Sequence, residues 1–158
     1  MNLRIGFGFD THKLAENHSF WLGGVQIAHS KGATGHSDAD VLIHAICDAL
    51  LGAAGLRDIG FQFPDTNDEY KGIDSKILLK LTVKLLKEKQ IAINNIDSTV
   101  VLQNPKISDY IPGMIRALSP ILEISEDQLS IKAKTSEKLG FIGREEGVSA
   151  HAVVLLSK

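Results

Sequence analysis

Apolar residues alternate with small or charged ones at the start of the chain. Every second position from residue 3 to residue 9 is apolar: Leu3, Ile5, Phe7 and Phe9. A period of two is typical of a β-strand, so we predict a first strand that ends at Asp10. The Gly23-Gly24 pair separates two short apolar runs and predicts a hairpin. Residues 30–37 are polar with two glycines, and we expect a mobile loop there.

Helical and strand-like periods continue through the rest of the chain. They predict helices over residues 38–54, 74–89 and 110–122, strands over residues 96–102, 129–133 and 148–156, and loops over residues 57–71 and 140–147. Ser37 with Asp40 resembles a capping arrangement for the first helix. Pro112 lies in the first turn of the third, where proline is tolerated. The order of elements predicts an α/β fold (an α+β sandwich) of ferredoxin-like type, with helices on one face of a mixed sheet.

The composition is that of an ordinary globular domain. The 158 residues are 44% hydrophobic and 23% charged, which predicts a single domain over residues 1–158. The net charge of −2 gives no sign of the positive surface that binding to a nucleic acid or an anionic membrane requires. The single cysteine, Cys47, excludes an internal disulfide and is expected to be a small buried hydrophobe. Neither a secretion signal nor a transmembrane run is found, so a cytoplasmic location is expected.

One carboxylate and two imidazoles form the most informative candidate site. Asp10 and His12 follow the first strand two residues apart, so their side chains can lie on the same side, and His44 lies in the first long helix. These ligand types suit Zn²⁺ or a similar metal ion with one coordination position left open. An open position implies a catalytic metal site rather than a structural one. Asp40 and Asp48 share a helix face with His44, and either could accept a hydrogen bond from its second ring nitrogen. The alternative is a set of ordinary polar loop residues.

Two further segments have the composition of phosphate sites. Residues 35–40 form a glycine-bearing loop before a helix N-terminus, where backbone N–H groups and the helix dipole favour an anion. His36 and Ser37 add side-chain donors there; the alternative is a capped helix with a packed histidine. Residues 132–141 combine lysines, hydroxyls and Glu137, a set that suits a phosphate with Mg²⁺. The alternative for this second segment is a solvated charged loop.

Two weaker signals concern a sugar and a base. Residues 58–66 hold carboxylates that could bind sugar hydroxyls, whereas Phe61 and Phe63 in the same loop are expected to pack. Residues 102–106 form a strand-to-loop turn whose backbone could contact a base edge. Each signal alone is unspecific, and they gain meaning only in combination with the segments above.

Together these motifs resemble one family over essentially the whole chain. They run in that family's order: Gly6-x-Gly8-Phe9-Asp10-x-His12, His36-Ser37-Asp38-x-Asp40-x-x-x-His44, Asp48-Ala49-Leu50-Leu51-Gly52-Ala53-Ala54, Asp58-Ile59-Gly60, Phe63-Pro64-Asp65-Thr66, and Glu137-Lys138-Leu139-Gly140-Phe141-x-Gly143-Arg144. The family is 2-C-methyl-D-erythritol 2,4-cyclodiphosphate synthase, of the non-mevalonate isoprenoid pathway. The resemblance implies a homotrimer with active sites between adjacent subunits.

The resemblance also implies metal and catalytic roles. Zn²⁺ would be held by Asp10, His12 and His44, and Mg²⁺ or Mn²⁺ would be reached by Glu137. The residues implied to steady the transferring phosphate are His36 and Thr135.

Substrate contacts are implied for two groups of residues. Those on the polyol, the ribose and the neighbouring phosphate are Ser37, Asp58, Ile59, Gly60, Phe63, Pro64, Asp65, Thr66 and Asn67. Those around the cytidine diphosphate, within residues 102–108 and 134–137, are Lys106, Lys134 and Ser136. Phe141 and Arg144 are also implied to bind the substrate.

The implied reaction converts 4-diphosphocytidyl-2-C-methyl-D-erythritol 2-phosphate to the cyclic diphosphate and CMP. It needs no protein nucleophile, which agrees with the lone helical cysteine. One alternative is a metal-dependent phosphohydrolase, which would release linear phosphates. Another is a noncatalytic binder of isoprenoid diphosphates, with residues 143–146 near the trimer axis holding the diphosphate head. The structural alternative for residues 143–146 is a salt-bridged subunit contact.

Overall fold

The computed structural model of the chain describes residues 2–158, in which helices pack against a mixed sheet. A five-stranded sheet has the order β4-β1-β7-β5-β6, and a separate hairpin pairs β2 with β3. The strands are β1 (Leu3–Glu16), β2 (Phe20–Leu22), β3 (Val25–Ile27), β4 (Lys31–Thr34), β5 (Ala92–Val101), β6 (Leu129–Lys134) and β7 (Gly147–Ser157). Because β5 and β6 are parallel and the other neighbours antiparallel, the predicted mixed sheet is confirmed.

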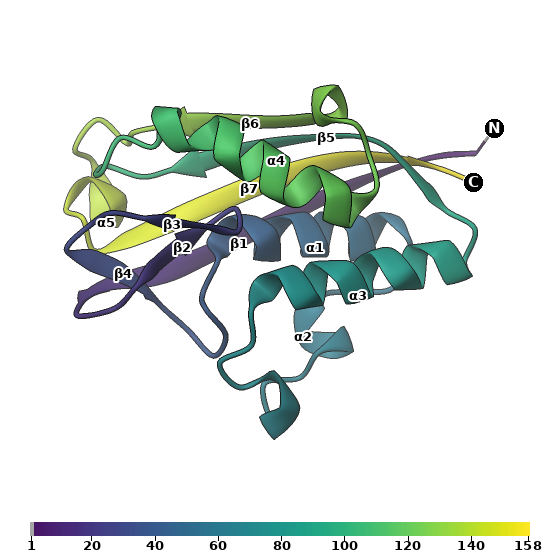
Figure 1. Cartoon of the computed structure of the whole chain (residues 1–158), viewed down its shortest axis with the longest axis horizontal. Helices are drawn as coiled ribbons and strands as arrows, with labels where there is room; N and C mark the ends of the chain where they lie inside the picture. Colours follow the sequence, from purple (N-terminus) through teal and green to yellow (C-terminus); the bar gives the residue numbers. More distant parts are fainter. Residues whose placement is uncertain (1) are drawn as a thin grey trace.

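The long helices α1 (Val41–Ala53), α3 (Ser75–Glu88) and α4 (Ile111–Leu122) lie on one face of the sheet (Figure 1). The short helices are α2 (Ile59–Gln62) and α5 (Gly140–Gly143), and α5 lies at the end of the sheet. Short 3-10 turns are present at Asp68–Tyr70, Ser108–Tyr110 and Glu126–Gln128. α1 packs directly on β1 and β7, α4 packs on β6, and α3 packs on α1 and α4. α1 is therefore enclosed between the sheet and α3, which explains why it is buried on nearly every side.

Glycines in β1 allow the central helix to approach the sheet. A Cβ at Gly6 would lie 2.0 Å from the Ala49 carbonyl oxygen, and one at Gly8 would lie 1.9 Å from that of Ala45. Only glycine fits such contacts with helix backbone. The apolar positions of the same strand consequently point away from the helices, and Ile5 is 75% exposed.

Several predicted boundaries were wrong. β1 continues past Asp10 to Glu16, because its second half pairs with β4 from Lys13↔Thr34 to Glu16↔Lys31. Part of the segment expected as a mobile loop is therefore a strand, and nothing in its local pattern indicated this. The predicted loops over residues 57–71 and 140–147 each contain a short helix.

The other predicted elements are confirmed. The hairpin forms around Gly23-Gly24 with Phe20 opposite Ile27, and the long helices and the strands at 96–102, 129–133 and 148–156 are present with shifts at their ends. Asp40 alone caps α1, accepting from the Ile43 N–H, and Ser37 takes no part in that cap. No helix among residues 2–158 is long and apolar enough to span a membrane. The ferredoxin-like assignment stays a prediction.

Candidate active site

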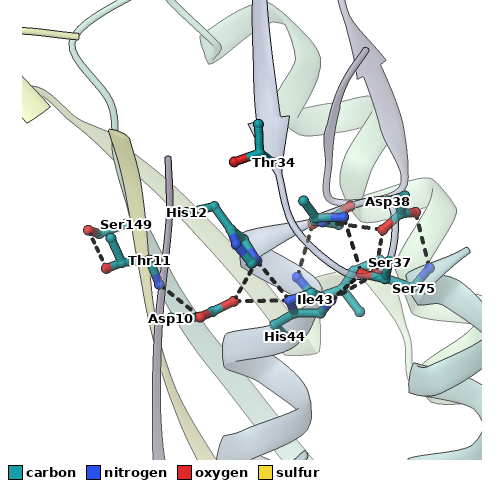
Figure 2. A network of polar contacts seen from close by, with 12 residues as sticks. Asp10, Thr11, His12, Thr34, Ser37, Asp38, Ile43, His44, Ser75 and Ser149 are labelled. Atoms are coloured by element: carbon teal, nitrogen blue, oxygen red, sulfur yellow. Dashed lines mark hydrogen bonds and ion pairs between the residues drawn. The ribbon is translucent and has the colours of Figure 1, made fainter. Parts of the chain in front are cut away.

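Three side chains predicted as metal ligands converge at the N-terminal part of α1. Asp10 and His12 are two residues apart on β1, so they share a face, and His44 faces them from the helix (Figure 2). Asp10 Oδ2, His12 Nε2 and His44 Nδ1 form a triangle whose sides are all 3.0 Å. The three residues are partly buried and form a group that could hold a metal ion.

The donor set and its dimensions fit a tetrahedral divalent ion. Metal–ligand bonds of about 2.0–2.1 Å place tetrahedral ligand atoms roughly 3.3 Å apart, close to the observed triangle. Burial raises the pKa of the Asp10 carboxyl, but hydrogen bonds and charges from His12 and His44 outweigh it and hold this pKa well below its usual range. The site therefore keeps a carboxylate at neutral pH, which favours a cation.

The second ring nitrogen of His44 faces serine hydroxyls. His44 Nε2 lies 2.9 Å from Ser75 Oγ at the start of α3 and 3.1 Å from Ser37 Oγ (Figure 2). The prediction that Asp40 or Asp48 would take this hydrogen bond was wrong. Helical spacing places both carboxylates on the same helix face as His44, but each accepts hydrogen bonds from backbone N–H groups instead.

Asp40 joins α1 to the β2–β3 hairpin. Its fully buried carboxylate accepts hydrogen bonds from the N–H groups of Gly23 (2.9 Å), Gly24 (2.7 Å) and Ile43 (3.1 Å). Asp48 instead accepts from the Ile59 N–H at 2.7 Å and so fixes the start of α2. The carboxylates of Asp40 and Asp48 therefore fix the backbone around the candidate metal site without accepting a hydrogen bond from the His44 ring.

A cavity of about 270 Å³ opens beside the metal-ligand triangle. It is lined by His12, His36, Ser37, His44, Ile59, Gly60, Phe63, Asp65, Tyr70 and Leu78. The structure thus brings predicted residues from three separate segments together. Tyr70 and Leu78 were not predicted as site residues. The only sequence signal for Leu78 was its apolar stripe on a helix, and Tyr70 had none.

Four further predicted residues lie in the loop that borders this cavity without lining it. Asp58 caps α2 by accepting from the Phe61 N–H at 2.8 Å, and Asn67 accepts from the Glu69 N–H at 3.1 Å. Pro64 and Thr66 lie between them and are exposed. Phe63 contacts Tyr70 with ring centroids 5.6 Å apart, so the predicted packing role of this phenylalanine coexists with a place in the cavity wall.

A second cavity of about 200 Å³ gathers the residues predicted around a nucleotide. It is lined by Leu102, Gln103, Pro105, Lys106, Ile107, Ser108, Ala133, Lys134 and Thr135. Thr135 is exposed, and its hydroxyl donates to Glu137 Oε1 at 3.1 Å. The two cavities have no lining residue in common, so the chain carries two separate groups of predicted site residues.

The YgbB family model matches residues 3–157 of the chain. This chain belongs to the YgbB family. A protein of Bacteroides fragilis named 2-C-methyl-D-erythritol 2,4-cyclodiphosphate synthase is 57% identical over 158 residues, covering 100% of this chain and 99% of the relative. The family resemblance inferred from the motifs is therefore confirmed.

Solved structures agree with the family assignment. The bifunctional IspDF of Campylobacter jejuni matches with a TM-score of 0.94 and 42% identity, over 98% of this chain and 42% of that longer protein. The CDP complex of IspF from Plasmodium falciparum matches with a TM-score of 0.86 and 39% identity, over 98% of this chain and 96% of that one. The family fold thus extends over almost the whole chain.

The remaining predicted residues of this YgbB family member lie in the glycine-punctuated segment after β6. Ser136 Oγ donates to the Leu139 carbonyl at 2.8 Å, and Phe141 is 42% exposed. Arg144 pairs with Glu146 at 3.1 Å within the chain, and both are exposed. None of the three lines either of the two cavities.

A larger surface hollow lies apart from these groups. It measures about 560 Å³ and is lined by residues 17–20 and 26–30 beside the hairpin. None of the predicted site residues lines it. The candidate active site is therefore indicated by the convergence of Asp10, His12 and His44 and not by the volume of the hollow.

Proposed function

We propose that this chain converts 4-diphosphocytidyl-2-C-methyl-D-erythritol 2-phosphate into 2-C-methyl-D-erythritol 2,4-cyclodiphosphate and CMP. The observation that carries the proposal is the full-length identity of 57% to a relative named for this synthase. The ligand triangle of Asp10, His12 and His44, opening into a cavity, supports it independently.

The proposed reaction is an intramolecular phosphoryl transfer. An oxygen of the substrate's 2-phosphate attacks the β-phosphorus, the bond from that phosphorus to the CMP oxygen breaks, and CMP leaves. Because the nucleophile belongs to the substrate, the protein must position the reacting groups and neutralise charge. Burial raises the pKa of the Cys47 thiol to about 12, so this residue stays protonated and takes no part.

Asp10, His12 and His44 are proposed to hold Zn²⁺ or a similar divalent ion. When bound, such an ion would supply positive charge that stabilises the charge developing during phosphoryl transfer. The Mg²⁺ or Mn²⁺ expected in addition is assigned to Glu137, whose exposed carboxylate supplies the hard oxygen ligand that these ions prefer.

His36 and Thr135 are proposed to steady the transferring phosphate. His36 is exposed at the mouth of the first cavity, and its carbonyl accepts from the Gly72 N–H at 2.8 Å, which holds its loop against the start of α3. Thr135 is its counterpart in the second cavity. Residues 58–67 would contact the polyol, and Lys106 and Lys134 would balance the charge of the cytidine diphosphate.

We further propose a homotrimer in which neighbouring subunits complete each site. The sheet face opposite the helices carries Ile5, Phe7 and Phe9, which are 75%, 63% and 49% exposed. An apolar surface of this kind is typical of a subunit interface. Assembly would also bring the first cavity of one chain to the second cavity of another. An isoprenoid diphosphate at the trimer axis and a cytoplasmic location stay predictions.

Phosphorus NMR of the purified protein with the cytidylated substrate and Mg²⁺ tests the reaction. We expect CMP and one cyclic diphosphate to appear in equal amounts. Linear phosphate products would instead establish a phosphohydrolase. No turnover by metal-loaded protein, together with tight retention of an isoprenoid diphosphate, would establish a noncatalytic binder.

A further inference from the structure

The two ring nitrogens of His44 have different polar partners. Nδ1 faces Asp10 Oδ2 and His12 Nε2, whereas Nε2 faces Ser75 Oγ at 2.9 Å (Figure 2). A metal-bound imidazole keeps its proton on the nitrogen that does not bind the ion. The partner of Nε2 therefore decides which nitrogen offers its lone pair to the metal.

Hydrogen counting fixes the direction of the contact with Ser75. Ser75 is fully buried, and its hydroxyl donates to Asp38 Oδ1. A hydroxyl has one proton, so Ser75 Oγ is left to accept from the Nε2–H of His44. The chain of hydrogen bonds thus runs from His44 through Ser75 to Asp38, and it ends on a carboxylate that only accepts.

Asp38 is held in place by backbone groups. Its Oδ2 accepts from the Ser75 N–H at 3.0 Å, and its Oδ1 accepts from the Asp40 N–H at 3.2 Å. The Asp38 N–H donates in turn to the Ile73 carbonyl at 3.1 Å. These contacts join the loop that carries His36 to the first turn of α3, so the orientation of His44 depends on this junction.

Ser37 is a weaker candidate for the same role. Its hydroxyl oxygen lies 3.1 Å from His44 Nε2 and accepts from the Ala39 N–H at 3.1 Å. It lines the cavity, whereas Ser75 is enclosed and has its proton already committed to Asp38. Ser75 is the partner that is closed off from solvent and does not line the cavity.

We propose that Ser75 and Asp38 are positioning residues, which keep the Nε2–H of His44 in place and so present its Nδ1 lone pair to the metal. This inference rests on the proposed metal site. It assigns a role to two residues that touch neither the ion nor the substrate, and it makes metal affinity depend on the junction between the His36 loop and α3.

Metal affinity of the Ser75→Ala variant tests the role of the hydroxyl. We expect Zn²⁺ and Co²⁺ to bind about 10- to 100-fold more weakly than to the wild type, in competition with a chelator at fixed pH. Ser119→Ala is the matched control, because Ser119 is also a buried helical serine and its hydroxyl has no partner among residues 2–158. We expect the affinity of that control to stay within twofold of the wild type.

Nitrogen NMR of the zinc-loaded protein tests the assignment of the two ring nitrogens directly. We expect a protonated Nε2 and a metal-bound Nδ1 on His44. Asp38→Asn keeps the shape of Asp38 but removes its charge, and it should weaken metal binding as Ser75→Ala does. This second variant tests the positioning role if Ser75→Ala does not fold.

Three outcomes would overturn the proposal. The first is a folded Ser75→Ala or Asp38→Asn protein with metal affinity within twofold of the wild type, and the second is an equal loss of affinity in the Ser119→Ala control. The third is a wild-type His44 bound through Nε2. A wild type that binds no divalent ion would refute the metal site itself, and the positioning role with it.

Discussion

The two groups of predicted site residues are built in opposite ways. The side chains of the candidate metal site are partly buried, and hydrogen bonds link them to one another, to the loop after β4 and to the start of α3. Around the second cavity, Lys106, Lys134 and Thr135 are all exposed. Partly buried, hydrogen-bonded side chains suit an ion whose ligands must be fixed, whereas exposed side chains suit a surface that another subunit completes.

The largest effect is expected from His44→Ala. Two remaining ligands are too few to hold an ion in an open site, so the variant should lose its metal. Activity should then fall by about 10³-fold or more, since the charge stabilisation supplied by the ion is lost. Metal content is measured by mass spectrometry, and circular dichroism checks that α1 is intact. Full zinc content in the folded variant would contradict the ligand assignment.

Ile5→Glu tests whether the second group depends on assembly. A carboxylate on the exposed apolar face should prevent the subunits from associating. We expect monomers by sedimentation, metal content equal to the wild type, and activity lower by about 10²-fold because each site loses its second half. Ile77→Glu is the matched control, because Ile77 is 48% exposed on α3 and away from that face. A fully active monomer would show that one chain carries the whole site.

The candidate metal site could be predicted from the sequence because Asp10 and His12 lie two residues apart after an alternating strand and His44 is an imidazole within a mostly apolar helical stretch. Asp10 and His12 were correctly expected on one side, although the strand continues beyond them instead of ending. The alternation in β1 revealed two faces but not which face is buried. That depends on Gly6 and Gly8 meeting the backbone of α1, a tertiary contact with no local pattern.

Ser75 shows the limit of sequence analysis most clearly. At its position it is simply the first residue of a helix after the capping residue Asp74. Its contact with His44 arises because the start of α3 folds back on the loop before α1, across 31 residues of sequence. The strand β4 was missed for a related reason, because its pairing with β1 is long-range and its own residues are polar or small.

Mixing two inactive variants tests directly whether sites are shared. His44→Ala chains keep an intact second group, and Thr135→Ala chains keep intact metal ligands. In random mixed trimers about 25% of the sites would combine a wild-type half from each chain, and activity should recover to about that level. Subunit exchange is verified by native mass spectrometry. Proven exchange without recovery would show that both halves act within one chain.

The smallest effect is expected from Glu137→Gln, which alters the exposed group alone. Glutamine keeps the size of Glu137 and loses the charge that a hard cation prefers, so half-maximal activity should need about tenfold more Mg²⁺. Zinc content should stay at the wild-type level, because Glu137 is not one of the three candidate zinc ligands and accepts a hydrogen bond from Thr135 instead. Glu126→Gln, an exposed glutamate outside both cavities, serves as the control in the same magnesium titration. A variant with altered zinc content and an unaltered magnesium curve would show that Glu137 and the candidate zinc ligands act on one ion. The candidate metal site and the exposed residues around the second cavity would then not be separate groups.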